Sequence, residues 1–427
     1  PGDVLGDKVD LALLFKDLSE KEKLEVFKLL AQRSPQRAGL VLREFQSEPG
    51  LEYLRALEPE VRASVIRELT ADDAAQFIFE MDEEERQELL EDIQGPEAVE
   101  IRHLLAYGEQ TAGRIMTPEY FAMEETATAA QAIAALQSRG SEVEVPFYVY
   151  VIDGRNHLVG VLSLRQLLLS APDVSLRNIM TTDIVSVTTE MDQEEVARLV
   201  SRYDLLAIPV VDPQHRLVGV ITIDDVIDIL KEEATEDVYR LAGTSEDERV
   251  FRSVFRAVRL RIPWLLASFF GGLLASQVIN HYQGMLTRVV MLAGFIPVVL
   301  GMGGNIGTQC STIIVRGLAT GRIEVREIWR VIFLQVRIGS ILGLIYGCLL
   351  GIGSNLLLGV SPRFALMLGL ALLSSMMIAA VIGSAVPMLL RRMGIDPAVA
   401  TGPFITTSVD VLATLVYFNL AFRLALS

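Results

Sequence analysis

The sequence contains little cysteine and little histidine: two cysteines and four histidines in 427 residues. Both cysteines, Cys310 and Cys348, lie in apolar stretches, which argues against a disulfide framework and against a thiolate metal site. The histidines are scattered, and the chain has no His-Glu-x-x-His element, the pattern of a helical zinc protease site. These absences argue against an enzyme, an intramembrane metalloprotease in particular, and no catalytic residue is predicted.

Acidic residues are also nearly absent from the second part of the chain, where only 4 of the 54 follow position 250. Residues 1–250 carry 50 acidic and 24 basic residues, a net charge of −26, whereas residues 251–427 carry 4 acidic residues and 14 arginines, a net charge of +10. Because the chain is nevertheless 51% hydrophobic, we predict an acidic soluble part followed by a membrane part. The acidic part argues against nucleic-acid binding and suits attraction of cations, with ordinary solubilising charge as the alternative.

The apolar runs after position 250 predict five membrane-spanning helices, each long enough for a hydrocarbon layer of about 30 Å. The predicted spans are 262–280, 288–315, 328–356, 364–390 and 398–424. Most arginines of this region lie at the ends of the spans that share a side with the N-terminal part, for example Arg259, Arg322 and Arg391. Since arginine accumulates on the cytoplasmic side, we predict a multi-pass protein of the plasma membrane with cytoplasmic N-terminal domains and an external C-terminus.

The second span contains Pro297 and four glycines in the segment Gly301-Met-Gly-Gly-Asn-Ile-Gly307. These residues permit a break in the helix, and freed carbonyls at membrane depth are tolerated only inside protein or along a water-filled path. Asn305 and Gln309 add side-chain oxygens one helical turn apart. We therefore predict a pore-lining segment that includes Gly304, Asn305 and Gln309, with close helix packing through small residues as the alternative.

Asp410 lies deep in the fifth span, after Thr406, Thr407 and Ser408. A carboxylate inside a membrane is costly and usually marks an ion path, although a hydrogen bond to a neighbouring helix is an alternative role. The ligands on offer are carboxylate, amide, hydroxyl and carbonyl oxygens, which favour Mg²⁺, Ca²⁺ or Mn²⁺ over copper or zinc. Because one carboxylate is few for a divalent cation, we predict a homodimer with both Asp410 side chains near the two-fold axis.

Residues 111–233 contain an internal repeat. Ile115-Met-Thr-Pro118 recurs as Ile179-Met-Thr-Thr182, and Gly160-Val-Leu-Ser-Leu recurs as Gly219-Val-Ile-Thr-Ile. With apolar strands at 147–153 and 207–212, this region resembles a tandem pair of CBS motifs, an α/β regulatory module. The resemblance implies an adenine nucleotide such as ATP at Thr222 and Asp225; the first unit lacks the aspartate, and a structural module without nucleotide is the alternative.

Short amphipathic helices predict an acidic helical superhelix over residues 1–110, with capping patterns at Ser19-x-x-Glu22 and Thr70-x-x-Asp73. A second acidic cluster ends the CBS pair, where Asp225/Asp228, Glu232/Glu236 and Glu233/Asp237 share helix faces. A bound divalent cation would relieve this repulsion, and a solvated face is the alternative. The cluster leads into a predicted connecting helix over 234–260, followed by the membrane domain over 261–427.

Taken together, these features resemble the MgtE-type bacterial magnesium transporters. The segments that carry the resemblance are Gly303-Gly-Asn-Ile-Gly-Thr-Gln309, Arg316-Gly-Leu-Ala, Asp396-Pro-Ala398 and Thr406-Thr407 with Asp410. The resemblance implies a homodimeric Mg²⁺ channel of the bacterial inner membrane, with Asp410 in the pore and Asp396 at its cytoplasmic side. It also implies that Mg²⁺ bound to the cytosolic domains shuts the pore, with these sensor candidates: Asp72, Asp204, Asp225, Asp228, Glu233, Glu236 and Asp237. Gln76 and Leu40 depart from the acidic pattern of the family, which indicates weaker gating or other carboxylates.

Two other transport functions remain open at this point. A path for Mn²⁺, Co²⁺ or Ca²⁺ would use the same oxygen ligands. A CBS-regulated anion channel would need cationic lining or helix N-termini at mid-membrane, and Asp410 argues against it.

Overall fold

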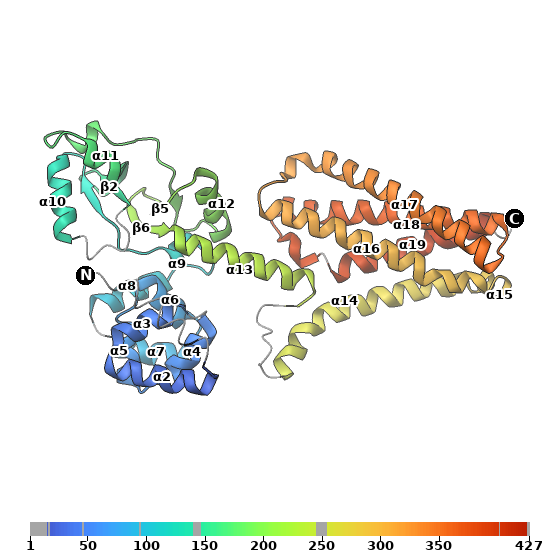
Figure 1. Cartoon of the computed structure of the whole chain (residues 1–427), viewed down its shortest axis with the longest axis horizontal. Helices are drawn as coiled ribbons and strands as arrows, with labels where there is room; N and C mark the ends of the chain where they lie inside the picture. Colours follow the sequence, from blue (N-terminus) through green and yellow to red (C-terminus); the bar gives the residue numbers. More distant parts are fainter. Residues whose placement is uncertain are drawn as a thin grey trace. The chain divides into compact units, whose positions relative to one another are not determined.

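The helices and strands follow the division of the sequence into an acidic and an apolar part. The computed structural model describes residues 15, 18–44, 47–93, 95–139, 147–244, 254–400 and 402–424. The chain divides into two compact units, Pro1–Leu230 and Lys231–Ser427, which are described separately (Figure 1).

The first unit begins with short helices, as predicted: α2 (Glu20–Arg33), α3 (Pro35–Glu44), α4 (Ser47–Arg55), α5 (Pro59–Ile66), α6 (Ala71–Phe79), α7 (Glu83–Asp92) and α8 (Pro96–Leu105). The capping box that starts α2 is present, because the backbone amide of Ser19 donates to Glu22 Oε2 over 2.8 Å. At the start of α6, Thr70 Oγ1 donates to Asp73 Oδ2 over 2.8 Å. Apolar faces such as that of Phe27 and Ala31 form the core between these helices.

The CBS pair consists of two three-stranded sheets with the same topology. The first holds β1 (Ala122–Glu124), β2 (Tyr148–Ile152) and β3 (Leu158–Ser163), and the second holds β4 (Val187–Thr188), β5 (Ala207–Val211) and β6 (Leu217–Thr222). In each sheet the first pair of strands is parallel and the second is antiparallel. The helices around them are α9 (Ala112–Ile115), α10 (Ala129–Arg139), α11 (Leu164–Leu169), η1 (Leu176–Asn178) and α12 (Gln193–Tyr203). The predicted α/β repeat is confirmed.

The repeated Ile-Met-Thr elements are exchanged between the two sheets. Thr117, which precedes the first sheet, pairs with Val220 of β6, and Thr181 pairs with Val161 of β3. A Cβ on Gly219 would lie 2.6 Å from Met116 Sδ, and a Cβ on Gly160 would lie 2.3 Å from Met180 Sδ. The two glycines thus make room for methionines that arrive from elsewhere in the repeat.

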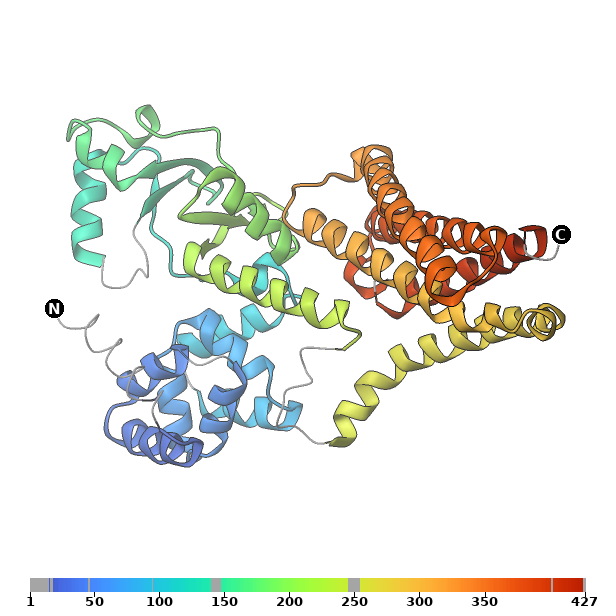
Figure 2. The ribbon, with the colours of Figure 1, turned by 45° about the vertical axis from the view of Figure 1, so that its right-hand side comes forward.

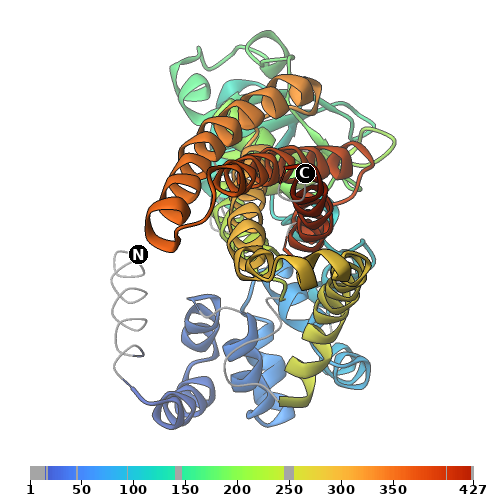
Figure 3. The same ribbon diagram turned by 90° about the vertical axis from the view of Figure 1, so that its right-hand side faces the viewer.

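Five helices of the second unit are long and apolar enough to cross a membrane, as predicted: Ala257–His281, Met291–Ala319, Val325–Leu358, Pro362–Arg392 and Pro403–Leu424. The elements are α14 (Val254–His281), α15 (Gln283–Arg288), α16 (Met291–Ala319), η2 (Val325–Glu327), α17 (Ile328–Leu358), α18 (Pro362–Arg392), η3 (Pro397–Ala400) and α19 (Pro403–Leu424). Helix α18 packs against α16, α17 and α19, and α14 packs against α19. Figure 2 shows this bundle obliquely and Figure 3 shows it end-on.

The predicted break in the second span is wrong, because α16 is one continuous helix through Pro297 and all four glycines. All four glycines keep helical geometry, and two of them, Gly303 and Gly307, serve close packing instead. A Cβ on Gly303 would lie 2.4 Å from Ser375 Oγ, and one on Gly307 would lie 3.1 Å from Ile405 Cγ2. The alternative role in small-residue packing therefore holds for one face of α16.

The connecting helix predicted over 234–260 is also not a single helix in the described residues. Helix α13 (Ile223–Leu241) starts earlier, directly after β6, and ends before Gly243, whose φ of +75° breaks the helical path. Helix α14 begins at Val254, and residues 245–253 lie outside the described part. Because α13 runs through residue 230, it belongs to both units and joins them covalently.

Two glycines of α17 provide a matched test of helix packing. A Cβ on Gly347 would lie 2.6 Å from the carbonyl oxygen of Gly369 in α18, whereas a Cβ on Gly353 would meet nothing within 4 Å. We expect Gly347→Ala to lower the stability of the protein by about 1–3 kcal/mol through overpacking. Gly353→Ala should instead be neutral or raise it by up to about 1 kcal/mol through helix propensity. Thermal unfolding in detergent measures both, and equal shifts would contradict the close contact of α17 and α18.

Candidate functional site

Helix α16 has one buried face and one exposed polar face. Gly303, Gly307 and Cys310 are buried among the neighbouring helices. The exposed polar side chains of the same helix recur at helical spacing: Asn305, Thr308, Gln309 and Thr312. Gly304 lies beside this row, and a Cβ added to it would meet nothing within 4 Å. At membrane depth such a polar row is stable only against water or another protein surface.

Asp410 lies on α19 next to the contact between α19 and α16. Its neighbour Val409 is buried and would lie 3.1 Å from a Cβ on Gly303 and 3.5 Å from one on Gly307. Asn305 lies between these two glycines along α16, so Asp410 and Asn305 share a level of the bundle. The Asp410 side chain is half-buried, and its carboxylate has no hydrogen-bond or ion-pair partner in the described part of the chain. A structural hydrogen bond to another described residue therefore does not account for it.

Thr406 and Thr407 hydrogen-bond to their own helix. Thr406 Oγ1 donates to the carbonyl of Pro403 over 3.1 Å, and Thr407 Oγ1 donates to that of Phe404 over 3.2 Å. Thr407 also packs against Gly271 of α14, where a Cβ would lie 2.4 Å from Thr407 Cβ. Each hydroxyl hydrogen is used in these bonds. The lone pairs of the hydroxyl oxygen stay available to a cation or to its water shell.

Asp396 lies in the short connection between α18 and α19 and contacts the end of α13. Its Oδ1 accepts from the backbone amide of Ala398 over 2.9 Å, which caps η3. Its Oδ2 is ion-paired with Nη1 of Arg240, and Nη2 of the same guanidinium is ion-paired with Glu236 Oε1. Two of the predicted metal-binding carboxylates, Asp396 and Glu236, are thus brought together around an arginine that the sequence reasoning did not single out.

Asp225, another acidic candidate, has a local role at the start of α13. Thr222, at the start of α13, donates from both its backbone amide and its hydroxyl to Asp225 Oδ2, which forms a helix cap. Ser163 and Gln166 form the same cap at the start of α11, so the two CBS repeats are alike at this position. The remaining sensor candidates along α13 are Asp228, Glu233 and Asp237, and Asp204 is exposed at the end of α12 with a φ of +51°.

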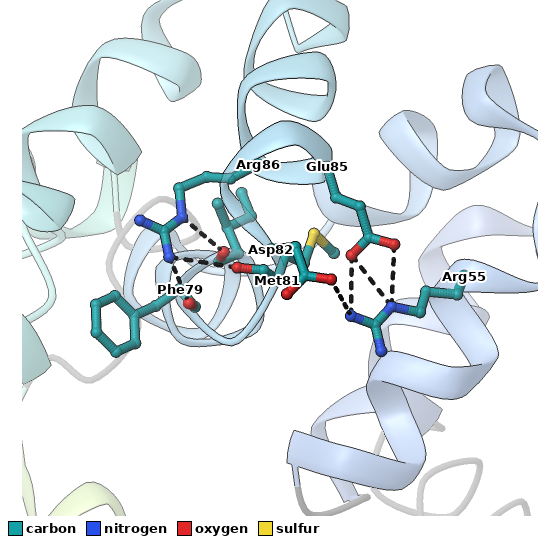
Figure 4. Close-up of polar contacts among 7 residues, drawn as sticks. Arg55, Phe79, Met81, Asp82, Glu85 and Arg86 are labelled. Atoms are coloured by element: carbon teal, nitrogen blue, oxygen red, sulfur yellow. Dashed lines mark hydrogen bonds and ion pairs between the residues drawn. The ribbon is translucent and has the colours of Figure 1, made fainter.

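In the N-terminal helices, arginines pair with several of the carboxylates. Arg55 Nη2 lies 2.9 Å from Glu85 Oε2 and 3.9 Å from Asp82 Oδ2, and Arg86 donates to the carbonyl of Phe79 over 2.7 Å (Figure 4). The hydrogen bond from Arg55 holds the pKa of Glu85 below its usual value. Arg43 Nε likewise lies 2.7 Å from Asp73 Oδ2. These carboxylates have arginine as their counter-ion, so solvation and ion pairing account for them.

Asp72 is buried in the first turn of α6, and Gln76 is exposed one turn later, while Leu40 is half-buried in α3. Within the described residues, no three Asp, Glu, His or Cys side chains come together as a metal site. A divalent ion bound by the predicted sensor residues would therefore take its ligands from separate elements or through its own water shell.

Two inter-helix hydrogen bonds were not anticipated from the sequence. Tyr417 Oη donates to the carbonyl of Leu292 over 2.7 Å, and Ser375 Oγ donates to that of Val299 over 3.0 Å. Both tie α16 to its neighbours on the buried side, away from the polar row. No short-range pattern marks such pairs, whereas Arg240 could have been noticed from its position four residues after Glu236.

Comparison with protein families matches three parts of the chain. The MgtE intracellular N domain matches residues 7–110, the CBS domain matches 112–172 and 176–232, and the MgtE family, described as a divalent cation transporter, matches 296–420. The magnesium transporter MgtE of Enterococcus faecalis is 40% identical over 410 residues, 95% of this chain and 89% of that protein. The magnesium transporter MgtE of Thermus thermophilus is 39% identical over 326 residues, 75% and 72% of the two chains.

Among solved structures, the soluble part of a magnesium transporter is 32% identical with a TM-score of 0.49, covering 53% of this chain and 88% of that one. The cytosolic domain of the Mg²⁺ channel MgtE in complex with ATP is 36% identical with a TM-score of 0.49, covering 52% and 90%. The relatives are named as transporters, which agrees with the expectation that this chain is not an enzyme. The chain belongs to the MgtE family of divalent cation transporters.

Proposed function

We propose that this protein is a Mg²⁺-selective channel of the bacterial plasma membrane, shut by Mg²⁺ that binds to its acidic cytosolic domains. The observation that carries this proposal is the carboxylate of Asp410, which lies unpaired at the level of Asn305 on the exposed polar face of α16. Relatives over most of the chain are named magnesium transporters.

The oxygen-only chemistry of the path fits Mg²⁺. Asp410 supplies a carboxylate, Asn305 and Gln309 supply amides, and Thr406 and Thr407 supply hydroxyls. Mg²⁺ prefers oxygen ligands and gives up its water shell reluctantly, so a polar row that holds the hydrated ion is sufficient. The negative charge of Asp410 favours cations over anions.

In this proposal the ion path forms between two copies of the chain. The polar row of α16 is exposed in a single chain, and one Asp410 provides a single negative charge. A second copy related by a two-fold axis would cover this face, enclose the row away from lipid and double the charge.

In this proposal the pore is gated through α13, which connects the acidic cytosolic surfaces to the helix that carries Asp410. Helix α13 carries Asp225, Asp228 and Glu233 and ends beside Asp396, just before α19. At low Mg²⁺ the acidic faces repel one another, and bound Mg²⁺ screens them and favours the closed arrangement. The shift in gating can be no larger than the difference in Mg²⁺ binding between the closed and open states.

The same proposal places the N-terminal domains in the cytosol and the C-terminus outside the cell, since most arginines of the membrane unit then face the cytosol. An ATP site at Thr222 and Asp225 stays a prediction from the CBS pattern. Bound nucleotide would compete there with the helix cap that Asp225 now forms.

Flux into liposomes that contain the purified protein tests the transported ion. We expect Mg²⁺ uptake that falls as Mg²⁺ is raised on the cytosolic side, with Co²⁺, Mn²⁺ or Ca²⁺ carried less well. Stronger uptake of one of those ions than of Mg²⁺ would identify that ion as the substrate. Uptake of chloride without uptake of any divalent cation would favour the anion channel.

The exposed face of α16 can be tested by cysteine accessibility in a Cys348→Ser background, because Cys348 is exposed and Cys310 is buried. We expect Asn305→Cys to react with a charged thiol reagent at least about ten-fold faster than Ile341→Cys, since the first faces water in a pore and the second faces lipid in this proposal. Ile341 is a suitable control because it is an apolar residue of α17 and is 59% exposed. Equal rates would contradict a water-filled path along this row.

A further inference from the structure

Arg240 links α13 to the segment that begins the last membrane helix. We propose that Arg240 is a built-in counter-ion that holds the end of α13 on the η3–α19 junction when no divalent cation is bound there, and that Mg²⁺ takes its place. Arg240 is a positioning residue in this proposal, because it acts through Asp396 and Glu236 rather than on the conducted ion. The inference rests on the proposed gating by Mg²⁺.

The contacts place one guanidinium between two carboxylates from different elements. Nη1 of Arg240 pairs with Asp396 Oδ2, and Nη2 pairs with Glu236 Oε1, one turn earlier on α13. The side chains of Arg240, Glu236 and Asp396 are 31%, 25% and 34% exposed, so water and ions reach all three. Since Oδ1 of Asp396 caps η3 at Ala398, Oδ2 is the oxygen that faces α13.

The ion pair lies beside a close backbone contact. A Cβ on Gly402 would lie 3.1 Å from the carbonyl oxygen of Leu241, and a Cβ on Gly243 would lie 3.6 Å from Pro403 Cγ and 3.8 Å from Trp264 Cβ. The last turn of α13 therefore rests directly on the start of α19. Asp410 follows Pro403 by seven residues, a rise of about 10 Å along the helix. Movement of α13 at this point acts on the helix that carries the pore carboxylate.

The charge balance of this cluster explains why a divalent cation can replace the arginine. One guanidinium and two carboxylates leave a net charge of −1, whereas a divalent cation would neutralise both carboxylates. Ion pairs that water reaches are individually weak, so the guanidinium can be displaced without a large barrier. Arg240 then keeps α13 on the η3–α19 junction without Mg²⁺. Mg²⁺ stabilises the same contact more strongly when its concentration rises.

Removal of the guanidinium tests the proposal through Mg²⁺ flux. In Arg240→Gln we expect flux at low cytosolic Mg²⁺ to rise about three-fold or more, because the two carboxylates repel. Saturating Mg²⁺ should still close this variant, since the ion needs only the carboxylates. Asp396→Asn keeps the cap on Ala398 and should raise low-Mg²⁺ flux similarly, and the double variant should add little beyond either single one. Arg392→Gln is the matched control, because Arg392 is exposed nearby and has no partner in the described residues.

A distance measurement provides a readout that does not depend on transport. Spin labels at Val238→Cys and Met393→Cys, both exposed positions of the second unit, report the separation of α13 from the end of α18 in a background that lacks Cys348. Without Mg²⁺ we expect one narrow distance distribution in the parent protein, a broad one in Arg240→Gln, and a narrow one again after Mg²⁺ is added.

The two measurements separate failure of this inference from failure of the proposed function. Unchanged distances and unchanged low-Mg²⁺ flux in Arg240→Gln would overturn the role of Arg240 even if the parent channel is closed by Mg²⁺. If instead the distances broaden as expected but parent flux ignores Mg²⁺, the arginine contact stands and gating by Mg²⁺ fails.

Discussion

Replacing Asp410 by asparagine should reduce Mg²⁺ flux by about 100-fold or more, because the substitution removes the carboxylate from membrane depth while keeping its shape. In a homodimer the variant removes both negative charges from the path at once. The measurement is Mg²⁺ uptake into liposomes, with the oligomeric state checked by size-exclusion chromatography. Full Mg²⁺ conductance in a folded Asp410→Asn protein would refute the pore assignment.

Asn419→Ala is the matched control for that experiment. Asn419 is an exposed polar residue of the same helix, more than two turns further on, and its side chain donates to Tyr282 Oη and to the carbonyl of Leu415. We expect near-normal flux in this variant, so a loss in both proteins would indicate damage to α19 rather than loss of a cation ligand.

Neutralising Asp225, Asp228 and Glu233 together should leave the channel conducting at Mg²⁺ concentrations that close the parent protein. Asparagine and glutamine are the suitable replacements, because an amide oxygen at position 225 can still accept from the backbone amide of Thr222 and preserve the cap. The charge that attracts Mg²⁺ is lost, so the closed state gains nothing from the ion. Flux as a function of cytosolic Mg²⁺ is the measurement.

A variant with three neutralised glutamates of α7 controls for the change in net charge. Glu84, Glu88 and Glu91 are exposed and lie far along the sequence from α13. Neutralising them should leave the Mg²⁺ dependence of flux close to that of the parent. If the α13 variant also closes normally at high Mg²⁺, the sensor assignment is wrong.

Most of the fold could be predicted from local patterns. The length of the apolar runs predicted the five membrane-spanning helices, and the Ser19-x-x-Glu22 pattern predicted the start of a helix. The recurring segments at Gly160 and Gly219 indicated the repeat. Each of these signals depends on residues close in sequence, where periodicity and capping chemistry act directly.

The errors arose where the neighbours of a residue decide its role. The glycines of α16 permit either a broken helix or a close helix contact, and only the positions of Ser375, Ile405 and Val409 select the contact. The ion pair between Arg240 and Asp396 joins residues 156 positions apart, so no local pattern contains it. Asp410 and Asn305 were identifiable because a polar side chain in an apolar span is conspicuous without knowledge of its surroundings.

The exchange of Met116 and Met180 between the CBS sheets has a consequence for dissecting this protein. A fragment of the first CBS repeat that ends near residue 174 would keep the sheet β1–β3 but lose Met180 and the Thr181 pairing that cover it. The second CBS repeat alone would lack Thr117 and Met116 in the same way. Each half would expose apolar surface and an unpaired strand edge, so isolated halves should aggregate. We therefore expect the complete CBS pair to be the smallest piece of this region that stays soluble on its own.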